Sequence, residues 1–310
     1  MSANQIQRLA FAAYNDQVDL LQRVNKDRVH ISSALAALAA LGTWGRYPNN
    51  MSRELEVYLG VPHIPPPTNV SIPVVVQKPR KLQPKVQRHD LPFMLPHVLF
   101  AHLYKHNRQI FDDIILGATR GHGTRVSEFW RGVVTRRDPR IRYHPMCGRS
   151  GWIEHAVPIS LHGDAVPCVS VGHAGVKSLD AYSWQSVLAD GTTTHIKHYV
   201  FGMFEQSKAH LGEHGVDSND AMWRVIVWSL NALFDGRWPA KDWNDQPWPH
   251  GSSEAALSGE YLADGFFAVV WLLKGDLDYF AKALKLRHYA AHELCDFCPC
   301  TKDETKPTSA

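Results

Sequence analysis

Val157-Pro158-Ile159-Ser160-Leu161-His162-Gly163-Asp164 is the stretch that decides the fold, because it reads as a short apolar strand followed by a Gly-Asp turn. Two more strand candidates follow, Ser183 to Leu188 and His195 to Phe204, with the turn residues Ala189-Asp190-Gly191 between them. Three successive strands joined by short connections predict an antiparallel meander.

A helix and a further strand follow the meander. Asp217 to Asp220 is typical of a helix cap, and residues 221 to 234 carry a broad apolar face. Phe266 to Leu273 is a run of eight apolar residues and predicts a buried strand covered on both faces. It ends at Lys274-Gly275-Asp276-Leu277-Asp278, after which a helix is expected from Tyr279 to Leu284. The second half is therefore expected to be mixed α/β.

The sequence divides into four regions. Residues 1–60 predict a helical N-terminal region. Residues 61–97 form a proline-rich linker, because nine of the chain's 19 prolines lie between Pro62 and Pro96, a density that disfavours both a helix and a central strand. Residues 98–150 begin with a helix over Val98 to Leu116 and continue into an arginine-rich stretch. Residues 151–310 contain the α/β core and a cysteine-rich tail.

The composition indicates a soluble intracellular protein. Hydrophobic residues make up 45% of the 310, enough for one large domain or two smaller ones. The longest apolar run has eight residues, well short of the roughly 20 that span a membrane, so no membrane partner is expected. The polar N-terminus does not resemble a signal peptide. Five cysteines, three of them crowded near the C-terminus, suit a metal site in a reducing compartment.

Arginines are concentrated between Arg120 and Arg149, where eight of them face only Glu128 and Asp138. Guanidinium groups bind phosphates bidentately and release counterions from a nucleic acid. The candidate nucleic-acid contacts are Arg131, Arg136, Arg137, Arg140 and Arg142. The alternative is a solvated loop that pairs with acidic patches elsewhere in the fold.

Three antiparallel strands, a helix and then a buried strand resemble, in that order, a ribonuclease H-like core. In that family one carboxylate lies on the first strand and a second at the end of the fourth, which implies Asp164 and Asp276 as catalytic residues, with Asp278 as a competitor for the second place. Converging carboxylates hold Mg²⁺ or Mn²⁺ for phosphoryl transfer. The alternative is structural: a Gly-Asp turn and a helix cap.

The tail contains a candidate zinc site. Two thiolates in a Cys-x-x-Cys turn can reach one tetrahedral Zn²⁺, and a nearby histidine can add a nitrogen ligand. The candidate ligands are His292, Cys295, Cys298 and Cys300. Four zinc ligands within so short a segment would be crowded. Cys147 or residues of a longer chain are therefore candidates for some of the ligands. Redox or unligated thiols are the alternative, although a βαβ setting is lacking.

Asp164, Asp276 and a Cys/His insertion before a third acid together resemble transposases that use two Asp and one Glu. The sequence motifs at residues 162–167, 274–280 and 295–300 also resemble those of mobile-element reading frames. The resemblance covers roughly residues 150–300. It implies a DNA partner, metal-dependent strand cleavage or joining, and a nuclear location. Only ten residues follow Cys300, so we expect the last helix and its acid to be absent and this copy to be truncated and inactive.

Two other classes of function stay open. One is a non-catalytic, zinc-stabilised module that binds nucleic acid or protein, and the other is an unrelated metabolic enzyme. A Walker A sequence, a Gly-x-Ser-x-Gly elbow and a complete dinucleotide-binding fingerprint are all missing from the sequence. A serine or thiol hydrolase remains open because its triad residues need not be adjacent in sequence. The sequence does not specify the oligomeric state.

Overall fold

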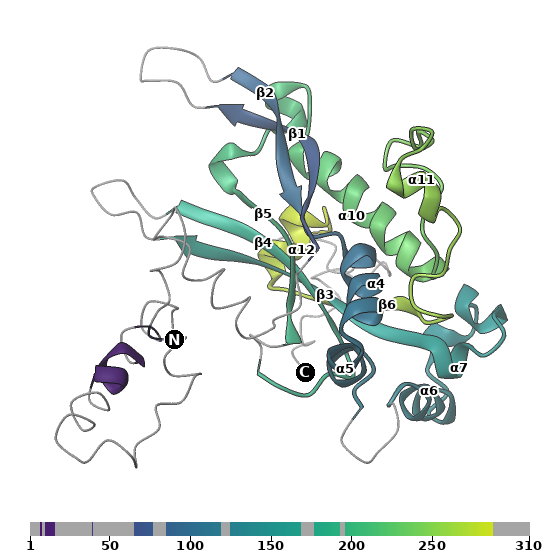
Figure 1. Cartoon of the computed structure of the whole chain (residues 1–310). Coiled ribbons are helices and arrows are strands. Elements are labelled where there is room, and N and C mark those ends of the chain that lie inside the picture. The colour runs from purple at the N-terminus through teal and green to yellow at the C-terminus, as the bar shows by residue number, and fades with distance from the viewer. Residues whose placement is uncertain are drawn as a thin grey trace, which may run out of the picture. The chain divides into compact units, whose positions relative to one another are not determined.

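The computed structural model describes Gln7, Ala39 and residues 10–15, 65–76, 85–118, 125–168, 177–192 and 196–287. The chain divides into two compact units, residues 1–63 and residues 64–310. In the first unit residues 10–15 are helical and the Gln7 side-chain amide donates to the Ala39 carbonyl at 3.2 Å. Most of the expected helical N-terminal region lies outside the described residues. The second unit contains the labelled elements of Figure 1.

The proline-rich segment forms a hairpin where an extended connector was expected. Strand β1 (Thr68–Val76) pairs antiparallel with β2 (Lys85–Phe93) in a two-stranded sheet. Val70, Ile72 and Val74 of β1 alternate into the core. Proline is tolerated here because each strand of a two-stranded sheet has an outer edge, where a missing N–H group removes no ladder hydrogen bond.

The helix predicted over residues 98–116 is broken in the middle. Helix α4 (Pro96–His106) stops at Asn107, and α5 (Arg108–Ile110) then leads into a π-helical turn over Phe111–Ile115. Asn107 leaves the helical conformation, with φ −146° and ψ 63°, and its side chain accepts a hydrogen bond from the Ile110 N–H group. Asparagine thus ends one helix and caps the next.

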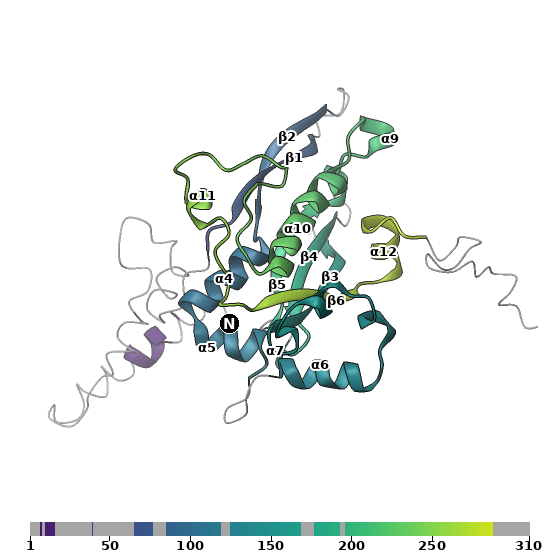
Figure 2. The same ribbon diagram turned by 90° about the vertical axis from the view of Figure 1, so that its right-hand side faces the viewer.

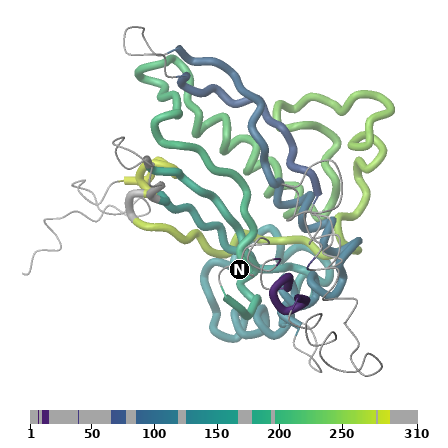
Figure 3. Tube along the Cα trace, turned by 60° about the vertical axis from the view of Figure 1, so that its left-hand side comes forward, coloured from purple at the N-terminus to yellow at the C-terminus, as the bar shows by residue number. Residues whose placement is uncertain are grey.

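The central sheet of the described residues has four strands, in the order β5-β4-β3-β6. Strands β3 (Ala156–Cys168), β4 (Lys177–Ser186) and β5 (His198–Phe204) form the antiparallel meander that the sequence predicts, and β6 (Phe267–Lys274) runs parallel to β3. The fold is therefore mixed α/β, with a mixed sheet and a separate antiparallel pair. Figure 3 follows the path of the chain through these strands.

Three strand predictions need correction. The second strand runs from Lys177 to Ser186 where Ser183 to Leu188 was expected, because Val187 and Leu188 already form a turn. Gly163-Asp164 is not a turn, because β3 continues through both residues to Cys168. Strand β6 is at the sheet edge among the described residues, and it is covered on both faces only in its first half, since Val270 and Leu273 are 38% and 48% exposed. Part of the apolar surface of β6 packs against helical residues, because the Trp271 ring contacts the rings of Phe129 and Trp130.

Figure 2 shows the remaining α-helices of the second unit. They are α6 (Val126–Thr135), α7 (Trp152–His155), α9 (Leu211–His214), α10 (Ser218–Asp235), α11 (Ser253–Leu257) and α12 (Leu277–Ala283). As predicted, Asp217 caps α10, its carboxylate accepting from the N–H groups of Asn219 and Asp220. No described helix is both long and apolar enough to cross a membrane.

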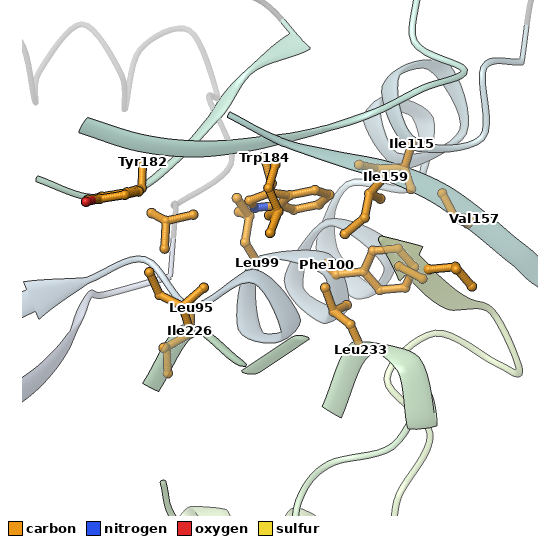
Figure 4. Packing of buried hydrophobic residues seen from close by; sticks show 14 of the residues in the cluster. Leu95, Leu99, Phe100, Ile115, Val157, Ile159, Tyr182, Trp184, Ile226 and Leu233 are labelled. Carbon is orange, nitrogen blue, oxygen red and sulfur yellow. The ribbon is translucent and has the colours of Figure 1, made fainter. Parts of the chain in front are cut away.

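The core lies between the four-stranded sheet and two helices. Figure 4 shows Ile159, Tyr182 and Trp184 of the sheet facing residues of α4 and α10. Helix α4 contributes Phe100, which is fully buried, and α10 contributes Leu233. Burial of such large apolar side chains is the main favourable contribution to folding.

A buried histidine joins α4 to α10. His97 is 2% exposed, and its Nδ1 lies 2.8 Å from the Ser229 hydroxyl oxygen. Burial lowers the pKa of His97 from 6.5 to about 3, because the imidazolium would lose its hydration. The folded protein therefore keeps this side chain neutral at pH values where the unfolded chain takes up a proton.

We predict that acid weakens the fold through His97. Between pH 6.5 and 3 the unfolded chain is protonated at this residue and the folded chain is not. The free energy of unfolding therefore falls as the pH drops below 6.5, by about 1.4 kcal/mol per pH unit. His97→Asn keeps a polar atom near Ser229 and cannot titrate, so urea unfolding between pH 7.5 and 5 should show a smaller loss. His89→Asn, at an exposed position, is the control; equal losses in both variants would contradict the prediction.

Candidate active site

Two Gly-Asp pairs lie at the same level of adjacent parallel strands. The register of β3 and β6 pairs His162 with Lys274, and each of these residues is followed by Gly and Asp. Asp164, inside β3, and Asp276, just beyond the end of β6, therefore each lie two residues after the last paired residues of the two strands. Both line one cavity of about 60 Å³, called here the acidic pocket. Its lining residues are Asp164, Ala165, Asp180, Tyr182, Glu205, Asp276, Tyr279, Lys282 and Ala283.

One aromatic ring explains both glycines. A Cβ atom at Gly163 would lie 1.8 Å from the Tyr279 ring, and one at Gly275 would lie 2.2 Å from it. The ring therefore rests on the bare backbone of both strands just before each aspartate. Asp276 also caps α12, its Oδ1 accepting from the Tyr279 N–H group at 2.6 Å. The cap and the ring together fix α12 against the strand ends.

Two phenol groups in the lining of this pocket lack partners. Tyr182 and Tyr279 are 4% and 7% exposed, and neither hydroxyl has a hydrogen-bond partner among the described residues. Their ring centroids lie 6.1 Å apart. Burial raises the pKa of Tyr279 to about 12 and raises that of Tyr182 as well, with Asp180 adding to the second shift. Both groups are therefore neutral hydrogen-bond donors at physiological pH.

The charges around the acidic pocket are unevenly compensated. Its lining holds four carboxylates and one ammonium group, that of Lys282, which lies 3.9 Å from Glu205. Asp180 is paired with Lys208, which is only 6% exposed. Asp164 and Asp276 make no ion pair with any residue that the structure describes. These two carboxylates are thus the ones available to a cation.

The donor set fits a magnesium ion held loosely. Mg²⁺ is usually bound by one or two carboxylates, with water and substrate phosphate completing its octahedron. Asp164 offers both oxygens, and Asp276 offers the Oδ2 that does not cap α12. Within the described part of the chain no three His, Cys, Asp or Glu side chains form a group that could hold a metal ion. The fit is therefore to a two-carboxylate site rather than to a closed cage.

The candidate DNA-contacting arginines lie on α6 and the turns that follow it. Arg131, Arg136, Arg137, Arg140 and Arg142 are all exposed, and Arg131 lies 3.9 Å from Glu154. Arg137 has a φ of 52°, an unusual value for a residue with a side chain. Tyr143 is 84% exposed and stacks with Arg142, whose guanidinium carbon lies 5.3 Å from the ring centroid. The segment presents cations together with an aromatic face.

Other arginines of the cluster have structural contacts. Arg140 forms an ion pair with Asp138 at 2.6 Å, and its guanidinium lies 4.1 Å from the centre of the Trp271 ring. The hydrogen bond from Arg140 lowers the pKa of Asp138 to about 2. Arg149 donates to the carbonyls of Phe234 and Asp235 at the end of α10. Arg140 therefore has partners that a phosphate would have to displace.

The zinc candidates cannot be located in the same way. His292, Cys295, Cys298 and Cys300 all lie outside the described residues, so zinc binding at the tail stays a prediction. Cys147, the other candidate thiol, donates to the Ile141 carbonyl at 3.3 Å, and burial raises its pKa.

The sequence did not single out several pocket residues. Asp180 and Glu205 come from β4 and from the turn after β5, and they reach the pocket only because the meander folds back beside β3. Tyr279 carried a local signal, since it lies three residues after the second Gly-Asp pair. Comparisons of the chain with protein-family models, with curated proteins and with solved structures return no match.

We predict that Gly163→Ala destabilises the protein through Tyr279. The added methyl group overlaps the ring, and overpacking of this kind costs about 1–3 kcal/mol. In a Tyr279→Ala background the same substitution should cost much less, which a double-mutant cycle by urea unfolding measures. Gly212→Ala is the matched control, because nothing lies within 4 Å of a Cβ atom there. Additive effects of the Gly163 and Tyr279 substitutions would show that the ring contact is unimportant.

Proposed function

We propose that this chain is a transposase-like DNA-binding protein whose core cleaves or joins DNA strands with Mg²⁺ or Mn²⁺ bound by Asp164 and Asp276. One observation carries the proposal: each carboxylate follows by two residues the paired positions His162 and Lys274 of adjacent parallel strands, and both carboxylates line one acidic pocket. Converging carboxylates are what metal-dependent phosphoryl transfer requires.

The topology supports a ribonuclease H-like core. Three antiparallel strands are followed by α10 and then by a fourth strand, which lies parallel beside the first. This is the order in which that family builds its sheet, with one acid on the first strand and another after the fourth.

The pocket chemistry supports a role for a divalent cation. Four carboxylates would repel a phosphodiester, so a bound cation is needed before a nucleic acid can approach. When bound, Mg²⁺ would polarise the phosphoryl oxygen and lower the pKa of a bound water. The neutral hydroxyl of Tyr279 can donate a hydrogen bond to a water or phosphate oxygen in the pocket.

A second candidate function is a non-catalytic DNA-binding protein. It is favoured by the structural role of Asp276, which caps α12. Both candidates need a DNA-binding surface, for which the exposed arginines on and after α6 and the aromatic ring of Tyr143 are suited. They differ in whether bound DNA is cut.

We predict that Asp164 and Asp276 bind Mn²⁺ and support strand cleavage. Asp164→Asn and Asp276→Asn should each weaken Mn²⁺ binding, measured by calorimetry, because each removes a negative ligand. Nicking of supercoiled DNA by the unchanged chain is expected to be weak, and it should fall further in either variant. Asp113→Asn, at an exposed aspartate outside the pocket, is the control. Unchanged Mn²⁺ binding in both pocket variants would remove the metal site, whereas metal binding without nicking would favour the non-catalytic candidate.

We predict that the exposed arginines bind DNA through its phosphates. Each phosphate contact contributes about 0.9 to the slope of log K against log salt, so Arg136→Ala combined with Arg137→Ala should reduce the slope by roughly two. Arg224→Ala, an exposed arginine on α10, should leave the slope unchanged. Asp164→Asn should leave DNA binding intact or slightly tighter, since it removes a negative charge. Undetectable or salt-insensitive association with DNA would rule out both candidates.

A further inference from the structure

A second cavity, remote in sequence from the acidic residues, is walled by aromatic rings. It has a volume of about 470 Å³, within the range of roughly 300–1,000 Å³ that is usual for small-ligand sites. Four tryptophans line it: Trp228 of α10 and Trp238, Trp243 and Trp248 of the loop that follows. We call it the tryptophan pocket. Residues 65–67, all prolines, form another part of its wall.

The rings stand at steep angles to one another. Trp228 makes angles of 76° with Trp243 and 66° with Trp248, at centroid distances of 5.6 and 6.2 Å. The indole N–H of Trp228 donates to the Lys241 carbonyl at 3.0 Å, and that of Trp248 donates to the Pro239 carbonyl at 2.9 Å. These bonds hold the two rings and satisfy their polar edges within the loop. The cavity is therefore lined by aromatic surface on which two of the four indole donors are already used.

The lining also has a defined charge. Among the described residues that line the tryptophan pocket, Glu254 is the only acidic one, and none is a lysine or an arginine. His97 lies in the lining too, and it stays neutral because burial lowers its pKa to about 3. It packs edge-on against Trp228 and Trp238, at centroid distances of 5.0 and 5.4 Å. The site thus combines aromatic surface with one negative charge and no positive charge.

This combination selects among ligands. The face of an aromatic ring attracts cations, and aromatic cages are the usual recognition site for methylated ammonium groups. An unmethylated ammonium would lose more hydration and would need several acceptors, of which the lining offers few. A nucleotide would bring a phosphate, which Glu254 repels and no lining cation neutralises. An uncharged apolar ligand would leave the carboxylate unused.

We propose that the tryptophan pocket binds a methylated ammonium group, as carried by a trimethyllysine side chain or by choline. The aromatic rings surround the methyl groups and Glu254 balances the charge. The cavity extends beyond the size of such a headgroup and leaves space for the chain that carries it. This site is independent of the acidic pocket and of the proposed strand chemistry.

The test compares ligands of one shape and different charge. Quenching of tryptophan fluorescence and calorimetry with the full chain would be used to measure binding of choline and of N-acetyl-trimethyllysine amide. The expected result is that each binds roughly tenfold or more tightly than its uncharged counterpart, 3,3-dimethylbutanol for choline, and than unmethylated N-acetyl-lysine amide. The tighter of the two charged ligands would identify the source of the headgroup.

Two variants complete the test. Trp243→Ala should weaken binding of the charged ligands by about tenfold, and Glu254→Gln should weaken it about threefold without affecting the fold. Glu260→Gln, at an exposed glutamate outside the lining, is the matched control. The proposal would be overturned by equal binding of 3,3-dimethylbutanol and choline, by no binding of either charged ligand, or by a short single-stranded oligonucleotide that competes for the pocket. If Trp243→Ala does not fold, the ligand comparison and Glu254→Gln decide alone.

Discussion

The parallel pairing of β3 with β6 is the constraint on which the rest of the structure depends. It sets His162 opposite Lys274, and so brings two Gly-Asp pairs, more than a hundred positions apart in sequence, to the same level. The Tyr279 ring can then lie on both glycines at once. A slip of one residue would move every side chain of β6 to the other face and separate the two glycines from the ring. The register of β3 and β6, the position of the Tyr279 ring and the acidic pocket therefore depend on one another.

Local patterns in the sequence predict much of this fold. The meander, the capped helix after Asp217 and the final strand all follow from periodicity, turn residues and cap chemistry. The errors are also physical. The prolines of residues 61–97 argued against strands, but a two-stranded hairpin has outer edges where proline costs little. An apolar run over β6 argued for a strand covered on both faces, but α6 and Arg140 cover the Trp271 ring without a further strand.

The candidate sites differ in how far the sequence reveals them. Asp164 and Asp276 carry a repeated local signal, a Gly-Asp pair after an apolar run, so they could be chosen in advance even though β3 continues past the first pair. Asp180 and Glu205 carry none, because their approach to the pocket depends on how far each strand of the meander extends. The arginines were chosen by density alone. Density does not distinguish Arg136 from Arg140, which is also exposed but is bonded to Asp138 and lies over the Trp271 ring.

Helix α10 contacts both candidate sites, and this limits how a ligand in one site can affect the other. Trp223 packs against Tyr182 of the acidic pocket, at a centroid distance of 5.6 Å, while Trp228 forms a wall of the tryptophan pocket. These residues are five positions apart, about 7.5 Å along a helix axis. The helix runs without a break from Ser218 to Asp235, and Ser229 on it is bonded to His97 of α4. A ligand in one pocket can therefore act on the other through α10 only by moving the helix as a whole.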